Sequence, residues 1–278
     1  AQRRAAQGRY DDAVARGYRL LEWTAQWLLS SVGVDTSDLR PEQIPESVSI
    51  AANADGKRQT GLRNAWTLAA HHLGGAVAGE LIVFDTDLET GRTERIDCTR
   101  FGSGAYSVPS LVEHLTFETK AKFILCIETG GMFQRLQSHK FWKKAHCILV
   151  SMAGVPTRAT RRFVRRLAEQ CKLDVYAFVD CDPYGISNIY RTLKVGSGNA
   201  AHINQFFCVP NARFLGLMPQ DIEEWDLKDA THKLSEIDIK RARDALKNDP
   251  FFIQHKPWTK ALQQMIKMGV RAEQQALS

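Results

Sequence analysis

Acidic side chains follow two apolar segments of the sequence, at points where predicted strands end. Asp180 comes directly after VYAFV in the stretch VYAFVDCDPYGISNIY (175–190), Asp182 lies two residues further on, and Glu128 closes the segment KFILCIE (122–128). In an extended chain, residues i and i+2 point to the same side, so we expect Asp180 and Asp182 to converge. Glu128 is expected to approach them from a neighbouring strand, at the edge where parallel sheets form their sites. Carboxylates this close repel one another unless a cation lies among them.

Three carboxylates at one sheet edge form a hard-oxygen ligand set of the kind that Mg²⁺ favours. A bound Mg²⁺ would relieve the repulsion and leave open positions for a phosphodiester. The alternative is structural, because Asp182 precedes Pro183. An Asp before a proline in the first helical turn is typical of an N-cap. The spacing alone leaves metal binding and helix capping open.

A second candidate site is the arginine-rich segment TRATRRFVRRLAEQC (157–171). Its arginines recur at helical spacing and fall on one stripe, predicted to bind nucleic acid: Arg158, Arg161, Arg162, Arg165 and Arg166. Like charges at this spacing destabilise a helix, which favours a polyanionic partner that would be contacted through its phosphates, without sequence choice. Lys143 and Lys144 on the preceding predicted helix are expected to widen this patch. The alternative is a solvated face that acidic neighbours neutralise in the fold.

The elements that must position these side chains form an α/β pattern. Apolar strands over 122–128, 146–151 and 175–180 alternate with helices over 131–144, 158–171 and 187–194. Continuous apolar strands with helical crossovers predict a parallel sheet covered on both faces, a Rossmann-like core from about 118 to 220. Ahead of this core, GELIVFDT and RTERIDC predict two strands joined by a turn at Thr90-Gly91. Helices over 238–248 and 256–277 are predicted after it.

The first part of the chain has a different pattern. Apolar residues recur at helical spacing up to about residue 32, and a second helical piece is predicted over 61–75. Residues 1–78 are therefore predicted to form an α-helical segment, and residues 79–278 a separate α/β domain with C-terminal helices.

Composition sets the broad class of the protein. The chain has 278 residues and a formal net charge of +6, which permits nucleic acid as a partner. None of its six cysteines forms a C-x-x-C pair, so we expect buried free thiols in a reduced, intracellular protein. No apolar run approaches the roughly 20 residues of a membrane span, and the N-terminus does not resemble a signal peptide. These features predict an intracellular protein without a membrane partner, cytoplasmic and nucleoid-associated if the source is prokaryotic.

Taken together, these residues lie in segments that resemble the A subunit of DNA topoisomerase VI, a type IIB enzyme whose family includes the meiotic double-strand-break transesterase. The matching segments run in family order from about residue 79 to the end. They are RIDCTRFGSGAYSVPS, AKFILCIETGGMFQRL, HCILVSMAGVPTRATRRFVRRL, VYAFVDCDPYGISNIYRTLKVGSGN, ARFLGLMPQDI, DIKRARDALKNDPFF and MGVRAEQQAL.

The resemblance implies a Toprim-type sheet and an enzyme that breaks and rejoins double-stranded DNA. In that family the strand-end Glu and the D-x-D pair bind Mg²⁺ and serve catalysis, which corresponds to Glu128, Asp180 and Asp182 here. The resemblance also implies a homodimer of the A-type chain and an ATP-binding B-type partner. The sequence has no G-x-x-x-x-G-K-[ST] loop, which agrees with ATP binding by a partner.

The nucleophile is where the sequence departs from the family. The family's catalytic tyrosine lies upstream of the Toprim domain, in a short Arg-containing motif with adjacent tyrosines. Residues 1–78 contain only Tyr10 and Tyr18, and neither lies in such a motif, so no nucleophile is assigned. The segment GRYDDAVARGYRLLE (8–22) instead resembles helical regions of CRISPR-associated effectors. Two alternatives therefore stand beside the topoisomerase: a Toprim metal-dependent DNA nuclease, as in a defence system, and a non-catalytic DNA-binding module.

Overall fold

The computed structural model describes most of the chain. The described residues are 19–20, 22–27, 29–30, 34–39, 44, 50–61, 64–65, 75–102, 104–109, 111–196 and 201–277. The chain divides into two compact units, Ala1–Gly74 and Gly75–Ser278.

The first unit is helical where its predicted helices are described. Residues 19–20, 22–27, 29–30 and 64–65 are helical. Its apolar core is formed by Ala25, Leu29, Val34, Leu39 and Ala65. Tyr10 and Tyr18 lie outside the described residues, as does most of the predicted helix over 61–75.

The second unit is built on a mixed sheet, which confirms the predicted parallel α/β core. Among the described residues this sheet has six strands, in the order β4-β1-β7-β6-β8-β9. The strands are β1 (Ala76–Gly79), β4 (Tyr106–Ser107), β6 (Phe123–Ile127), β7 (Cys147–Ser151), β8 (Asp174–Phe178) and β9 (Arg213–Gly216). β7, β6, β8 and β9 run parallel, whereas β1 is antiparallel to both of its neighbours. β6 therefore lies between β7 and β8, and its ends are flanked by theirs.

One face of the sheet is covered by α4 (Gly130–Ser138) and α5 (Phe141–Ala145). They bury Met132, Phe133 and Trp142 against the side chains that β6 and β7 point to this face. The sequence predicted one helix here, but the chain breaks at Lys140, whose backbone is left-handed with φ 49°.

The opposite face is covered by α6 (Arg158–Cys171), as predicted. α6 buries Phe163, Val164 and Leu167 in the larger core cluster of the unit. The arginine-rich helix and the helix that carries Lys143 and Lys144 therefore lie on opposite faces of the sheet and do not form one continuous patch.

The segment after β8 turns at once into helix. A π-helical stretch, η2 (Gly185–Tyr190), continues into α7 (Arg191–Val195), followed by α8 (Ala201–Phe207) and, after β9, by α9 (Pro219–Glu224). The predicted crossover helix after β8 is thus confirmed, although it begins with a wider turn than an α-helix.

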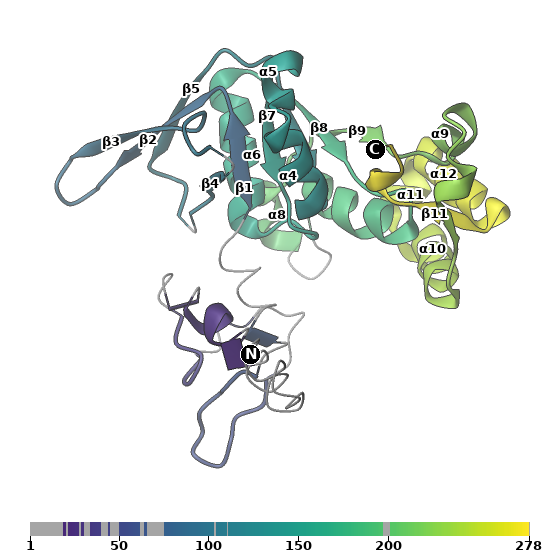
Figure 1. Ribbon diagram of the computed structural model, residues 1–278. Coiled ribbons are helices and arrows are strands. Elements are labelled where there is room, and N and C mark those ends of the chain that lie inside the picture. The colour runs from purple at the N-terminus through teal and green to yellow at the C-terminus, as the bar shows by residue number, and fades with distance from the viewer. Residues whose placement is uncertain are drawn as a thin grey trace, which may run out of the picture. The chain divides into compact units, whose positions relative to one another are not determined.

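A separate sheet precedes the core. β2 (Leu81–Thr86) pairs antiparallel with both β3 (Thr93–Asp97) and β5 (Leu115–Thr119), in the order β3-β2-β5. The β2–β3 hairpin confirms the two strands predicted around Thr90-Gly91, and it extends away from the main sheet (Figure 1).

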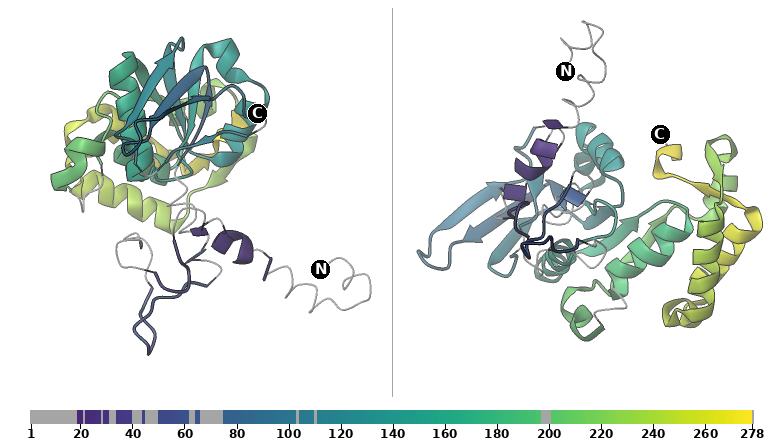
Figure 2. Two further views of the ribbon diagram at one scale, coloured as in Figure 1. Left: turned by 90° about the vertical axis from the view of Figure 1, so that its left-hand side faces the viewer. Right: turned by 90° about the horizontal axis from the view of Figure 1, so that it is seen from below.

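The C-terminal helices gather beside β9 (Figures 1 and 2). The elements are η4 (Lys228–Ala230), β10 (Thr231–Lys233), α10 (Glu236–Asn248), α11 (Pro250–Gln254), α12 (Lys256–Met268), β11 (Val270–Ala272) and η5 (Gln274–Leu277). The prediction of one helix over 256–277 is wrong. Gly269 takes a left-handed φ of 68°, which ends α12, and the next residues form β11 instead.

Two further expectations concern composition. All six cysteines are free thiols, five buried and Cys171 half-buried, as expected. In the part of the chain that the structure describes, no helix is both long and apolar enough to cross a membrane.

Candidate functional site

The predicted acidic residues meet at the carboxyl ends of two neighbouring strands. β6 and β8 are parallel, and their last paired residues are Ile127 and Phe178. Glu128 follows β6 directly, and its amide donates a hydrogen bond of 3.0 Å to the carbonyl oxygen of Phe178. The amide of Asp180 in turn donates to Oε2 of Glu128 over 2.9 Å. The two strand ends are therefore tied together through the Glu128 carboxylate.

Asp182 lies at the start of the helical segment that follows. Its Oδ1 accepts a hydrogen bond of 2.6 Å from the amide of Gly185, so Asp182 does cap the first helical turn. A Cβ atom on Gly185 would lie 2.6 Å from the carbonyl oxygen of Asp180 and 3.2 Å from Oε2 of Glu128. Glycine is required here because the helix start passes this close to the carboxylates.

The three carboxylates share one electrostatic environment. Glu128 is only 7% exposed. Its burial, with the nearby charge of Asp180, raises its pKa to about 8. The pKa of Asp180 is raised to about 6, chiefly by burial, with a further contribution from the charge of Asp182. Burial also raises the pKa of Asp182. Without a cation, burial and mutual repulsion therefore both disfavour the ionised forms of these carboxylates in the folded protein.

Gln274 is a site residue that the sequence analysis did not single out. Its side chain is fully buried and lies between the two strand ends. Its Nε2 donates to the carbonyl oxygen of Phe178, and its Oε1 accepts a hydrogen bond of 3.1 Å from Thr129, next to Glu128. Its backbone amide donates to Oδ1 of Asp180 over 2.8 Å. One residue from the C-terminal segment therefore contacts both of the segments that carry the acids.

Arg271 brings a positive charge to the same place. Nη1 of Arg271 lies 3.9 Å from Oδ2 of Asp182, and the arginine side chain is 38% exposed. The Nε atom of Arg271 is buried and has no hydrogen-bond partner among the described residues. β11 is held there because Cys181 and Ala272 exchange both backbone hydrogen bonds, of 2.8 and 3.1 Å. The sequence could not place Arg271 because the segment was assigned to a helix.

The carboxylate oxygens of the site are ligands that a hard divalent cation favours. The charges of neighbouring carboxylates raise the pKa of Glu128 and of Asp180, and a bound cation would relieve this repulsion. Each of the three carboxylates, however, has one oxygen bonded to a backbone amide. Within the described residues, no group of three or more His, Cys, Asp or Glu side chains is arranged to hold a metal ion. Binding of Mg²⁺ by Glu128, Asp180 and Asp182 therefore stays a prediction.

Comparison with protein families decides the ancestry of this site. A model of the Toprim domain shared by the topoisomerase 6 A subunit and Spo11 matches residues 123–278, more than half of the chain. The chain belongs to this topoisomerase 6 A/Spo11 family. A model of the all-beta domain in the DNA topoisomerase VI alpha subunit matches residues 73–121. Residues 1–88 match a different model, the Csm6 HEPN domain.

Individual relatives agree with this family. The A subunit of type 2 DNA topoisomerase 6 from Methanocaldococcus jannaschii is 54% identical over 206 residues, which cover 74% of this chain and 54% of the relative. The corresponding protein of Pyrococcus abyssi is 35% identical over 215 residues, 73% of this chain and 54% of the relative. The corresponding protein of Methanosarcina acetivorans is 38% identical over 195 residues, which cover 69% of this chain and 51% of the relative. The chain thus spans about half the length of these relatives.

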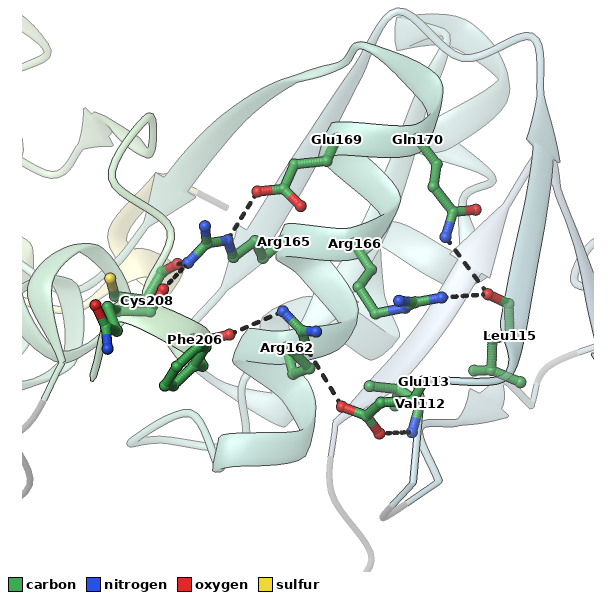
Figure 3. Close-up of polar contacts among 11 residues, drawn as sticks. Val112, Glu113, Leu115, Arg162, Arg165, Arg166, Glu169, Gln170, Phe206 and Cys208 are labelled. Carbon is green, nitrogen blue, oxygen red and sulfur yellow. Dashed lines mark hydrogen bonds and ion pairs between the residues drawn. The ribbon is translucent and has the colours of Figure 1, made fainter. Parts of the chain in front are cut away.

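Within this Toprim domain, arginines of α6 contact the chain itself (Figure 3). Arg162 donates to Oε1 of Glu113 over 3.2 Å and to the carbonyl oxygen of Phe206 over 3.0 Å. Arg165 donates to Glu169 over 2.8 Å and to the carbonyl oxygen of Gln205. Phe206 and Gln205 lie in the last turn of α8, so these guanidinium groups bind helix carbonyls that lack intrahelical partners.

The other arginines of the stripe differ in exposure. Arg166 donates to the carbonyl oxygen of Leu115 over 2.9 Å. Arg161 is only 5% exposed, and burial, with repulsion from Arg158, lowers its pKa to about 10. Arg158 is exposed. Arg161 also donates to the carbonyl oxygen of Thr192 over 3.5 Å. Four of the five arginines thus contact neighbouring elements, and DNA binding by the stripe stays a prediction.

Proposed function

We propose that this chain carries the Mg²⁺-dependent DNA-breakage site of an A-type subunit of a type IIB topoisomerase. The observation that carries the proposal is the meeting of Glu128, Asp180 and Asp182 at the carboxyl ends of adjacent parallel strands, within a Toprim domain of this family. Relatives named as the A subunit of type 2 DNA topoisomerase 6 support the assignment to DNA. The proposed metal ligands are these three carboxylates.

A bound Mg²⁺ would supply charge neutralisation and polarisation of a phosphodiester. The chain's own groups hold the carboxylates in place for it. The amides of Asp180, Gly185 and Gln274 each fix one carboxylate oxygen, which limits the rotation of all three side chains. Arg271 provides a solvent-accessible cation beside Asp182, suited to attract the negatively charged phosphodiester.

The proposed partners follow from the family assignment. They are double-stranded DNA, a second copy of the A-type chain and an ATP-binding B-type subunit. The nucleophile stays unassigned. Resealing of the DNA requires a covalent phosphotyrosine intermediate, which conserves the energy of the broken bond. The match with the relatives covers about half of their length and does not identify the tyrosine that would form it.

One observation favours a second candidate, a Toprim metal-dependent nuclease. The Csm6 HEPN model matches residues 1–88, and the topoisomerase models begin only at residue 73, so residues 1–72 match the HEPN model alone. With the same carboxylates but no tyrosine, the site would hydrolyse a phosphodiester and leave free DNA ends.

The test is incubation of the chain with supercoiled plasmid and Mg²⁺, with and without a B-type partner and ATP, followed by denaturing detergent and protease. Protein bound covalently to DNA ends supports the topoisomerase, whereas nicked or linear DNA with free ends supports the nuclease. Asp182→Asn is expected to abolish either product while the circular dichroism spectrum stays unchanged. Cleavage by Asp182→Asn at the wild-type rate would contradict the assignment of the carboxylate site.

A further inference from the structure

A row of lysines lies at the edge of the main sheet opposite to the carboxylates. The amino-terminal ends of β6, β7 and β8 are paired at Phe123, Cys147 and Asp174. Exposed lysines occupy the turns that enter these strands and the helix between them: Lys120, Lys122, Lys140, Lys143, Lys144 and Lys172. We refer to these six residues as the amino-edge lysines.

The amino-edge lysines are close to one another through the backbone. Lys122 directly precedes β6, and its amide donates a hydrogen bond of 2.7 Å to the carbonyl oxygen of His146, which directly precedes β7. Lys172 ends α6 just before β8. Neighbouring strands of a sheet are about 4.8 Å apart, so these turns form a line along the edge. Lys143 and Lys144 extend the line because α5 packs on β7 through Trp142.

Acidic residues do not neutralise this edge. None of the six lysines has an ion-pair partner within the described part of the chain. Asp174 lies at the edge but is 3.6 Å from Arg213, and Glu169 is paired with Arg165. Glu80 and Glu118 are the further acids on the adjoining turn and strand. The edge therefore keeps a clear excess of positive charge.

We propose that the amino-edge lysines form a binding surface for the phosphate backbone of double-stranded nucleic acid, separate from the carboxylate site. An extended row of point charges matches a duplex, which carries a negative charge about every 1.7 Å along its axis. It does not converge on one point, as a site for a single phosphate would. Lysine gives affinity through charge without reading bases, so the surface binds without sequence preference.

The position of the surface separates it from the carboxylate site. β6 connects the two edges, and its residues from Phe123 to Glu128 span roughly 17 Å at the rise of an extended strand. A duplex on the amino edge therefore does not present its contacted phosphates to Glu128. The choice of nucleic acid as the partner rests on the proposed function. The inference adds to that function a contact between the domain and a duplex that needs no metal ion.

The test uses the full chain and a fluorescent duplex of about 30 base pairs, enough to span the site sizes typical of duplex binding, with anisotropy measured in EDTA over a series of KCl concentrations. The triple variant Lys122→Ala, Lys143→Ala, Lys144→Ala is expected to lower the salt slope by about 2.7, since each lost phosphate contact removes about 0.9. That slope corresponds to a roughly 500-fold loss of affinity at about 0.1 M salt. The matched control, Lys228→Ala, Lys256→Ala, Lys260→Ala, removes the same charge from exposed positions in the C-terminal region and is expected to keep the wild-type slope.

Equal losses in the two triple variants would overturn the proposal, because net charge alone would then explain binding. An unchanged slope in the amino-edge variant would overturn it as well, while leaving the Mg²⁺-dependent cleavage test unaffected. Displacement of the duplex by polyglutamate at equal charge concentration would show a surface for acidic polymers in general, and would contradict the choice of nucleic acid. A wild-type chain that binds no duplex at low salt in EDTA would refute this surface, whereas the proposed function would still be decided by the Mg²⁺-dependent cleavage test.

Discussion

Glu128→Gln should make the metal-free protein more stable at pH 8 and change its pH dependence. The folded protein raises the pKa of Glu128 to about 8 from an ordinary value of 4.5, mainly by burial and then by the charge of Asp180. Between these two pH values the folded state binds more protons than the unfolded state. Stability is therefore lost as pH rises through this window, and a neutral glutamine avoids that loss.

The magnitude follows from the same two values. One proton contributes at most about 1.4 kcal/mol of stability per pH unit, which over the interval from 4.5 to 8 gives an upper bound of about 5 kcal/mol. Relaxation of a buried site reduces this bound, so we expect about 2–3 kcal/mol between wild type and Glu128→Gln at pH 8, and almost no difference at pH 5. The glutamine oxygen can still accept the hydrogen bond from the amide of Asp180.

The assay is urea unfolding of both proteins in EDTA, followed by far-UV circular dichroism at half-unit steps from pH 5 to pH 8. All other ionisable groups are present in both proteins, so the difference between the two curves reports the replacement of Glu128. Parallel curves would refute the reasoning, because they would mean that Glu128 ionises in the folded protein as it does in the unfolded one. A variant less stable than wild type at pH 8 would mean that the carboxylate is net stabilising without a cation.

Three other predictions address the neighbouring residues. Gln274→Ala loses two buried side-chain hydrogen bonds and should lower the free energy of unfolding by about 2–3 kcal/mol in the same urea titration. The control is Gln254→Ala, at an exposed position of α11, which should change this free energy by less than about 0.5 kcal/mol. Arg271→Gln removes a positive charge that lies beside Asp182 and should raise the affinity of the protein for Mg²⁺ about threefold, because this charge repels the metal ion. The measurement is titration calorimetry with Mg²⁺ in the absence of DNA. Weaker binding by the variant would show that the arginine instead supports the structure of the site. Arg165→Ala loses its hydrogen bonds to Glu169 and to the carbonyl oxygen of Gln205 in α8 and should lower the free energy of unfolding by about 1–3 kcal/mol, whereas Arg158→Ala should leave it unchanged. Equal effects of the two substitutions would mean that Arg165 does not hold α8 in place.

The sequence was sufficient for the three central parallel strands of the sheet, β7, β6 and β8, and for the acidic residues, but not for β1, β4 and β9. Apolar runs such as ILCI and VYAF are typical of strands covered on both faces, and that pattern predicts parallel strands with helical crossovers. Placing Glu128 and Asp180 at the ends of two such strands was enough to predict that they meet, because parallel strands share one carboxyl edge.

The remaining features depended on tertiary contacts that local patterns do not encode. The helical spacing of KPWTKALQQMIKM continued smoothly into GVRAEQQAL, so the strand after Gly269 and the burial of Gln274 were missed. The glycine before a β-branched residue was the available signal for a helix end. Similarly, the charge stripe of α6 suggested an external partner, because the carbonyls of α8 that bind Arg162 and Arg165 come from some 40 residues further along the chain.

The bond between Gln274 and Asp180 joins residues 94 positions apart in the chain. During synthesis, a ribosome releases all three acids well before it releases the segment that holds them in place. A product that terminates before Ala272 would carry Glu128, Asp180 and Asp182 without β11 or Gln274. The arrangement of the three acids in the proposed DNA-breakage site therefore depends on a segment that is synthesised after them, and a chain cut short before it would carry the acids without the contacts that fix them.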